Sequence, residues 1–216
     1  MILSRGRRYI FIHIPKTGGT AMALALESRA MKDDVMLGDT PKARNRRHKA
    51  QTAQSHGRLW KHSTLTDIAG LATPEEIASF FTFTLVRNPW DRVVSYYHWL
   101  RAQSFAHPAV TIAQESDFKT FLYHPMIGQT LRSNPYASYL TDPTGQERAS
   151  LFIRLEHFDE DSAPLWDHLG FRLDLGHANT SDRVRDYRRY YSDADSQHLA
   201  QICAEDIARF GYCFEF

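Results

Sequence analysis

Three runs of consecutive apolar residues stand out along the chain, at positions 9–14, 80–86 and 151–155. Each run contains β-branched and aromatic side chains, and Pro15 closes the first one. Uninterrupted apolar runs of this length are typical of strands that are buried on both faces. The pattern therefore predicts three buried strands.

Helix signals lie between and after these strands. Residues 21–31 are strong helix formers. Asn88, Pro89 and Asp91 suit the N-cap, first and third positions of a helix that we expect to run to about residue 102. Further helices are predicted after the capping box of Thr73 and Glu76, at 159–169 before Gly170, and after Ser192 and Asp195, where Leu199, Ile202 and Ile207 form an apolar face.

The alternation of strands and helices predicts an α/β fold with a mostly parallel sheet, organised as a single domain over residues 1–216. In such folds the ligand lies at the carboxyl ends of the strands. Two segments are less regular. Residues 32–60 are basic and read as a mobile, solvated loop, whereas residues 103–148 mix aromatic residues with proline and glycine.

The composition agrees with one globular domain, because 43% of the 216 residues are hydrophobic and 24% are charged. A chain of this length buries roughly 70–75% of its unfolded surface, so it needs no disulfide or structural metal. We interpret Cys203 and Cys213 as buried thiols of a reducing compartment. No apolar run reaches the length of about 18 residues that a transmembrane helix needs. We therefore expect a soluble, cytoplasmic protein.

The formal net charge of +1 conceals an uneven distribution. Residues 1–60 carry 12 Lys and Arg against 4 Asp and Glu, whereas residues 61–216 carry 14 against 21. The near-neutral total excludes a generic polyanion binder, but the basic part leaves room for a small, highly charged anionic ligand.

A tight loop between the first strand and the first helix has the features of a phosphate-binding site. Glycines let the backbone approach a ligand closely, and the N–H groups and dipole at a helix start favour an anion. A Gly-Gly pair alone would indicate only a turn, but a lysine and two threonines accompany it. The lysine precedes the glycines, so the loop is not a Walker A motif. Its residues are Pro15, Lys16, Thr17, Gly18, Gly19 and Thr20.

A cation follows the second strand. P-loop NTPases keep a magnesium-binding aspartate there, but this chain has Arg87. Arginine at this place suggests a second anionic group that the protein binds directly, without metal. Ser95, about two helical turns further on, can donate its hydroxyl to the same anion. Taken singly, Arg87 could be a salt-bridged arginine and Ser95 a helix-surface serine.

Together, PKTGGT at 15–20 and LVRNPWDRVVSYYHWL at 85–100 resemble the sulfotransferases that use 3′-phosphoadenosine 5′-phosphosulfate (PAPS). The resemblance is to the carbohydrate-type branch, which includes heparan 2-O-sulfotransferases and bacterial sulfotransferase family 2 relatives. KHSTLTDI at 61–68, FIRLEHFDED at 152–161 and the tail at 179–214 are similar to further segments of that family. The resemblance implies a P-loop-NTPase-like, three-layer domain in which helices flank the central sheet.

The resemblance assigns the loop at 15–20 to the 5′-phosphosulfate of PAPS, and Arg87 with Ser95 to its 3′-phosphate. Lys16 would stabilise the charge that develops on the leaving phosphate. His62 matches the family's histidine segment and would accept the proton of the acceptor hydroxyl. The reaction implied is transfer of a sulfuryl group to a hydroxyl, which we expect to belong to a carbohydrate. It releases adenosine 3′,5′-bisphosphate (PAP) and requires no metal.

Members of the family usually close a C-terminal loop over the donor. Asn179, Ser181, Arg183 and Arg185 are the candidates here, and we assign Arg183 to donor binding. A solvated basic face is the alternative for this segment. We expect His13 and His98 to be structural.

The acceptor is expected to meet residues 103–148, with Phe118, Tyr123, Tyr136 and Tyr139 as candidate walls. The basic run at 42–49 is either part of a mobile loop or a contact for an anionic acceptor.

Two other functions compete with sulfuryl transfer. The first is a P-loop-related nucleotide-binding protein or kinase, against which the lysine order and the missing metal-binding acid count. The second is a nucleic-acid-binding module, which only the run at 42–49 supports. That run lacks the interleaved aromatic residues of a single-strand binder, so we expect no nucleic-acid partner.

Overall fold

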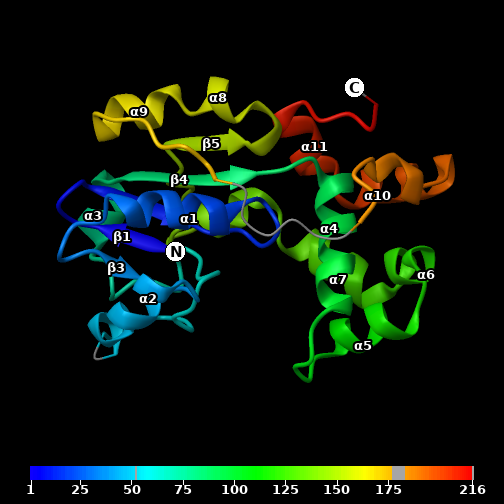
Figure 1. Cartoon of the computed structure of the whole chain (residues 1–216), viewed down its shortest axis with the longest axis horizontal. Coiled ribbons are helices and arrows are strands. Elements are labelled where there is room, and N and C mark those ends of the chain that lie inside the picture. Colours follow the sequence, from blue (N-terminus) through cyan, green and yellow to red (C-terminus); the bar gives the residue numbers. More distant parts are fainter. Residues whose placement is uncertain (52, 177–182, 216) are drawn as a thin grey trace. The chain divides into compact units, whose positions relative to one another are not determined.

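The computed structural model of the chain describes residues 1–51, 53–176 and 183–215. They form two compact units, Met1–Val86 with Tyr136–Asn179 and Arg87–Pro135 with Thr180–Phe216. We call them the sheet unit and the helical unit (Figure 1). The prediction of one domain over 1–216 stays a prediction.

The sheet unit contains the strands of the molecule and the helices that pack on them. The strands are β1 (Ile2–Ser4), β2 (Tyr9–Ile12), β3 (Val35–Met36), β4 (Phe81–Val86) and β5 (Leu151–Arg154). The helices are α1 (Gly19–Ser28), α2 (Pro41–Arg46), α3 (Pro74–Ser79), α8 (Phe158–Asp161) and α9 (Ala163–Leu169), with 3-10 turns η1 (Arg47–Ala50), η2 (Tyr136–Leu140) and η3 (Leu155–His157).

The sheet has the strand order β3-β1-β2-β4-β5. β2, β4 and β5 pair in parallel, and β1 is antiparallel to both β2 and β3. Four of the five strands in the described residues therefore point the same way, which confirms the α/β fold with a mostly parallel sheet. In register, Ile12 lies opposite Thr84 and Val86 opposite Arg154, so β2, β4 and β5 end at the same edge.

Successive residues of each strand face opposite sides of the sheet. Phe11 and Phe83 point toward α1 and α9, where Met22, Leu26 and Leu165 complete one core. The side chains between them on the strands point to the opposite face, on which η2 contacts β4. α8 lies beside β5 at the edge of the sheet (Figure 1).

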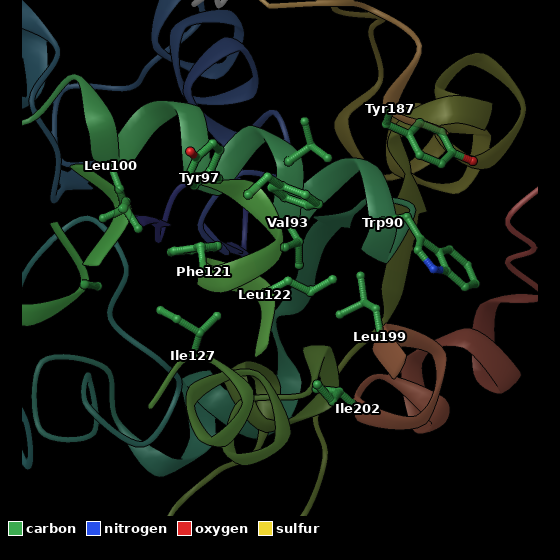
Figure 2. Packing of buried hydrophobic residues seen from close by; sticks show 14 of the residues in the cluster. Trp90, Val93, Tyr97, Leu100, Phe121, Leu122, Ile127, Tyr187, Leu199 and Ile202 are labelled. Carbon is green, nitrogen blue, oxygen red and sulfur yellow. The ribbon is translucent and has the colours of Figure 1, made fainter. Parts of the chain in front are cut away.

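The helical unit is built around α4. Its helices are α4 (Pro89–Arg101), α5 (Pro108–Glu115), α6 (Phe118–Tyr123), α7 (Pro125–Ser133), α10 (Asp193–Ile202) and α11 (Ala204–Phe210), with the 3-10 turn η4 (Tyr187–Tyr190). Figure 2 shows Val93 and Tyr97 of α4 among Phe121, Leu122 and Leu199 from the surrounding helices, and all of these side chains are buried.

The predicted helix starts are present. The side chain of Asn88 accepts a hydrogen bond from the Trp90 N–H over 3.1 Å at the start of α4. Both halves of the Thr73–Glu76 capping box form at α3, with distances of 2.9 and 3.2 Å.

Four expectations from the sequence need correction. The helix expected at 159–169 is divided at Ser162 into α8 and α9, because Pro164 cannot supply the backbone N–H that a continuous helix needs. The last helix is likewise divided, at Cys203. Residues 32–60 include β3, α2 and η1 and are not simply a loop. Finally, only Cys203 is buried; Cys213 is exposed, and both are free thiols.

No helix among the described residues is long and apolar enough to cross a membrane.

Candidate active site

The loop at 15–20 joins β2 to α1 through two residues with left-handed backbone. Lys16 has a φ of 68° and Gly18, the N-cap of α1, a φ of 86°. The hydroxyl of Thr17 is buried and donates to the Ile14 carbonyl over 3.0 Å. The side chain of Thr17 therefore holds the turn from inside, and the loop leads directly into the N–H groups at the start of α1.

Both glycines of the loop are enclosed by neighbouring side chains. A Cβ on Gly18 would lie 2.9 Å from Cδ1 of Leu155, the residue after β5, and one on Gly19 would lie 2.1 Å from Cδ2 of His13. Neither position can take a side chain without displacing its neighbour. The loop is therefore packed closely against Leu155 and His13, and glycine is required at both positions.

His62 lies against the end of β2, next to this loop. Its Nδ1 donates to the carbonyl oxygen of His13 over 2.7 Å. Its ring packs edge-on against the rings of His13 and Trp60, with centroids 4.6 and 4.9 Å away. Because a carbonyl can only accept, the Nδ1 of His62 carries the proton and its Nε2 has the free lone pair. This is the tautomer that a base needs.

Burial also fixes the charge of the two histidines. It lowers the pKa of His62 from 6.5 to about 4, although the hydrogen bond to His13 opposes this change. Burial, and then the proximity of His62, hold the pKa of His13 well below its usual value. Both imidazoles are therefore neutral at pH 7 in the protein without ligand.

Arg87, Asp91 and Arg183 form a charged cluster in the helical unit. Arg87 donates from Nε to Oδ2 of Asp91 over 2.9 Å, and Arg183 donates from Nη2 to Oδ1 over 2.6 Å. Ser95 lies one helical turn after Asp91 and is buried. The structure thus brings two of the predicted donor-binding arginines onto one carboxylate.

The predicted site residues fall into two groups that belong to different units. The loop and His62 lie in the sheet unit, and Arg87, Ser95 and Arg183 in the helical unit. Arg185 is exposed, and Asn179 and Ser181 lie outside the described residues.

The candidate acceptor walls differ in burial. Phe118 and Tyr136 are buried in the interior, so they do not face a ligand. Tyr139 is partly exposed, and Tyr123 is exposed and stacks on His198 with ring centroids 4.1 Å apart.

Two contacts of the candidate site residues do not follow from the sequence analysis. Asp91 was read only as a helix-dipole residue, although its i, i+4 spacing from Arg87 is the spacing of a helical ion pair. The carbonyl of His13 as the partner of His62 leaves no signal in the sequence, because every residue has a carbonyl.

No group of three or more His, Cys, Asp or Glu within residues 1–51, 53–176 and 183–215 is arranged to hold a metal ion.

Comparison with known proteins shows the family of the chain and a solved structure of similar fold. A family model described as "Sulfotransferase family" matches residues 1–213. Among solved structures, mouse sulfotransferase SULT7A1 complexed with PAP has a similar fold, with a TM-score of 0.54 and 14% sequence identity. That match covers 98% of this chain and 89% of the mouse chain. No curated protein sequence matches the chain.

Proposed function

Because the chain belongs to the sulfotransferase family, and is therefore an enzyme that uses PAPS, we propose that it moves the sulfuryl group to a carbohydrate hydroxyl without a metal ion. The observation that carries the proposal is the loop at 15–20, with backbone N–H groups, two enclosed glycines and Lys16 at the start of α1. The PAP bound to the mouse protein of similar fold supports the nucleotide part of the proposal.

In the proposed reaction, the acceptor oxygen attacks sulfur while the bond between sulfur and the 5′-phosphate oxygen breaks. The hydroxyl proton passes to Nε2 of His62, which is unprotonated because Nδ1 faces the His13 carbonyl. A donor with several negative charges raises the pKa of a nearby histidine, so His62 becomes a stronger base once the donor is bound. Lys16 and the start of α1 stabilise the charge on the departing phosphate.

The 3′-phosphate is assigned to Arg87, Ser95 and Arg183. Charge-assisted hydrogen bonds from arginine to phosphate are among the stronger polar contacts in proteins. The assignment also explains how the protein dispenses with a metal: Arg87 directly follows β4, where P-loop NTPases keep a magnesium-binding acid.

The acceptor and the cellular location belong to the same proposal. A carbohydrate acceptor follows from the resemblance of the two main motifs to the carbohydrate-type branch. A cytoplasmic location agrees with the two free thiols, Cys203 and Cys213.

The decisive measurement is calorimetry with PAP in the presence of either EDTA or Mg²⁺. We expect the wild type to bind PAP equally well in both buffers. Arg87→Ala should weaken binding at least tenfold, the value of one charged hydrogen bond, whereas the exposed Arg189→Ala should not. Binding that needs Mg²⁺, together with Mg²⁺-dependent ATP turnover, would instead indicate the kinase alternative.

The acceptor is tested separately, with labelled PAPS and matched panels of saccharides and phenols. Transfer to saccharides alone supports the proposal. Transfer to phenols alone would contradict the carbohydrate assignment and leave the donor assignment intact.

A further inference from the structure

Asp91 binds a different arginine with each of its carboxylate oxygens. Oδ2 accepts from Arg87 and Oδ1 from Arg183, at 2.9 and 2.6 Å. Arg87 precedes Asn88, the N-cap of α4, whereas Arg183 lies 92 residues after Asp91 along the chain. One carboxylate therefore joins two cations from distant parts of the sequence.

The three side chains are largely withdrawn from water. The exposed fractions are 16% for Arg87, 18% for Asp91 and 8% for Arg183. Like charges repel more strongly where water is scarce, so two guanidinium groups at this depth need a counter-ion. Asp91 supplies a negative charge that pairs with both of them.

The same contact fixes the direction of each guanidinium. A guanidinium is planar and carries five N–H donors, more than one carboxylate oxygen accepts. A carboxylate on one edge therefore fixes the orientation of the whole planar group. Ser95, one turn further along the same face of α4, adds a hydroxyl. Two oriented cations and one hydroxyl suit the geometry of a phosphate monoester.

We propose that Asp91 is a positioning residue for donor binding, which holds Arg87 and Arg183 side by side so that both bind the 3′-phosphate. This inference rests on the proposed function, since that function supplies the donor. Asp91 itself touches no substrate and acts through the two arginines.

A purely structural role for Asp91 predicts something different. An acid in the first turn of a helix is stabilised by the helix dipole, and its loss would lower the stability of α4 without regard to any ligand. The test therefore compares two ligands that differ only in the 3′-phosphate, PAP and adenosine 5′-monophosphate.

Calorimetry on the full chain with both ligands separates the roles. Asp91→Asn keeps the size of the side chain but removes its charge and one acceptor oxygen. We expect this variant to bind PAP at least tenfold more weakly than the wild type, with binding of adenosine 5′-monophosphate within twofold. Asp91→Glu, which keeps the carboxylate, should recover part of the loss.

Asp186→Asn is the matched control. Asp186 accepts from Nε and Nη2 of Arg188 at 2.8 and 3.1 Å in the same unit, and both side chains are exposed. This variant removes the same charge and an Asp–Arg pair of the same kind. It should leave the affinities for both ligands unchanged.

Wild-type affinity of Asp91→Asn for PAP would overturn the inference and leave the proposed function standing. Equal weakening for both ligands would also overturn it, in favour of the structural role. If the wild type binds no PAP, the proposed function fails and the inference with it. If Asp91→Asn does not fold, Arg183→Ala takes its place, and unchanged selectivity for PAP in that variant overturns the inference.

Discussion

Gly19 is the residue that links the loop to His13 and, through it, to His62. Its Cα lies so close to the His13 ring that a Cβ would be 2.1 Å from Cδ2. The His13 ring in turn packs on the ring of His62. A change at this one glycine would therefore reach His62 through a single side chain.

Gly19→Ala should displace the His13 ring and disturb both the loop and His62. Overpacking of this kind costs about 1–3 kcal/mol of stability, and we expect sulfuryl transfer to fall at least tenfold. Turnover of labelled PAPS and urea unfolding measure the two effects. Gly38→Ala is the control, because its Cβ would meet only Ala43 at 3.6 Å. Equal behaviour of the two variants would contradict the role of the contact.

His62 should also make stability depend on pH. Its folded-state pKa is about 4 and its ordinary value is 6.5, so between these values the unfolded chain binds a proton that the folded chain does not. The free energy of unfolding is therefore unaffected by His62 above pH 6.5 and falls as the pH drops toward 4. By pH 4.5 we expect a loss of about 2 kcal/mol.

Urea unfolding of His62→Gln at pH 7 and pH 4.5 checks this effect. The difference between the two pH values should be smaller than in the wild type by about 2 kcal/mol. His48→Gln, at an exposed position in η1, should keep the wild-type difference. A His62→Gln protein with unchanged pH dependence would show that His62 is not buried in its neutral form.

At the residue scale, the sequence predicted the side chains but not their partners. A pattern of residue types is enough to select the loop and His62 as candidates. The bond from Arg183 to Asp91 spans 92 residues, and only the fold brings such positions together. Arg87 and Asp91 are four residues apart within one helix start, so that pair was available to sequence reasoning.

At the scale of elements, the basic run at 42–49 has a structural role. Lys42 donates to the Glu27 carbonyl over 2.5 Å and Arg46 to the Met31 carbonyl over 2.6 Å. Lys49 donates to the carbonyls of Lys32 and Asp34. These oxygens lie at and after the end of α1, where cations satisfy carbonyls and favour the helix dipole. The run therefore anchors the far end of the helix whose start forms the candidate loop.

Replacing Lys42 and Arg46 together by alanine should destabilise the protein by about 1–2 kcal/mol, since each removes a charged hydrogen bond to a carbonyl. The free energy of unfolding in urea measures the loss. Arg44→Ala with Arg47→Ala, at exposed positions of the same run, should cost less than about 0.5 kcal/mol. A larger loss of stability in this control variant would contradict the anchoring role of Lys42 and Arg46.

The elements that the sequence predicted well are those with a local signal. β2, β4, β5 and the caps of α3 and α4 follow from apolar runs and capping residues. β1 and β3 have only three and two residues. They are defined by their pairing with other strands, and they are too short for a hydrophobic pattern to predict them. α5 and α7 each begin with a proline after a histidine N-cap, a start signal that the irregular composition of 103–148 obscured.

At the scale of the whole molecule, cations from both the basic and the acidic part of the sequence have structural partners. The side chains of Lys42, Arg46 and Lys49 donate to backbone carbonyls. Those of Arg87 and Arg183 both donate to the carboxylate of Asp91. A basic run in the sequence is therefore no sufficient sign of a surface for an anionic ligand.

The two thiols should report on folding of the whole chain. Cys213 is exposed, whereas Cys203 is buried and its pKa is raised to about 12 by that burial. We expect an aromatic disulfide reagent at pH 8 to label Cys213 rapidly and Cys203 only at the rate of unfolding. Cys213→Ser should abolish the fast phase. Rapid labelling of two thiols in the native wild type would contradict the burial of Cys203.

The hydrogen bond that orients His62 is made by the main chain of His13, not by its side chain. Alanine at position 13 would remove a ring and leave that oxygen where it is. Alanine scanning would therefore measure the effect of the His13 ring but not that of its carbonyl. Only backbone chemistry, such as replacement of the peptide unit by an ester, can test how the end of a β-strand sets the tautomer of His62.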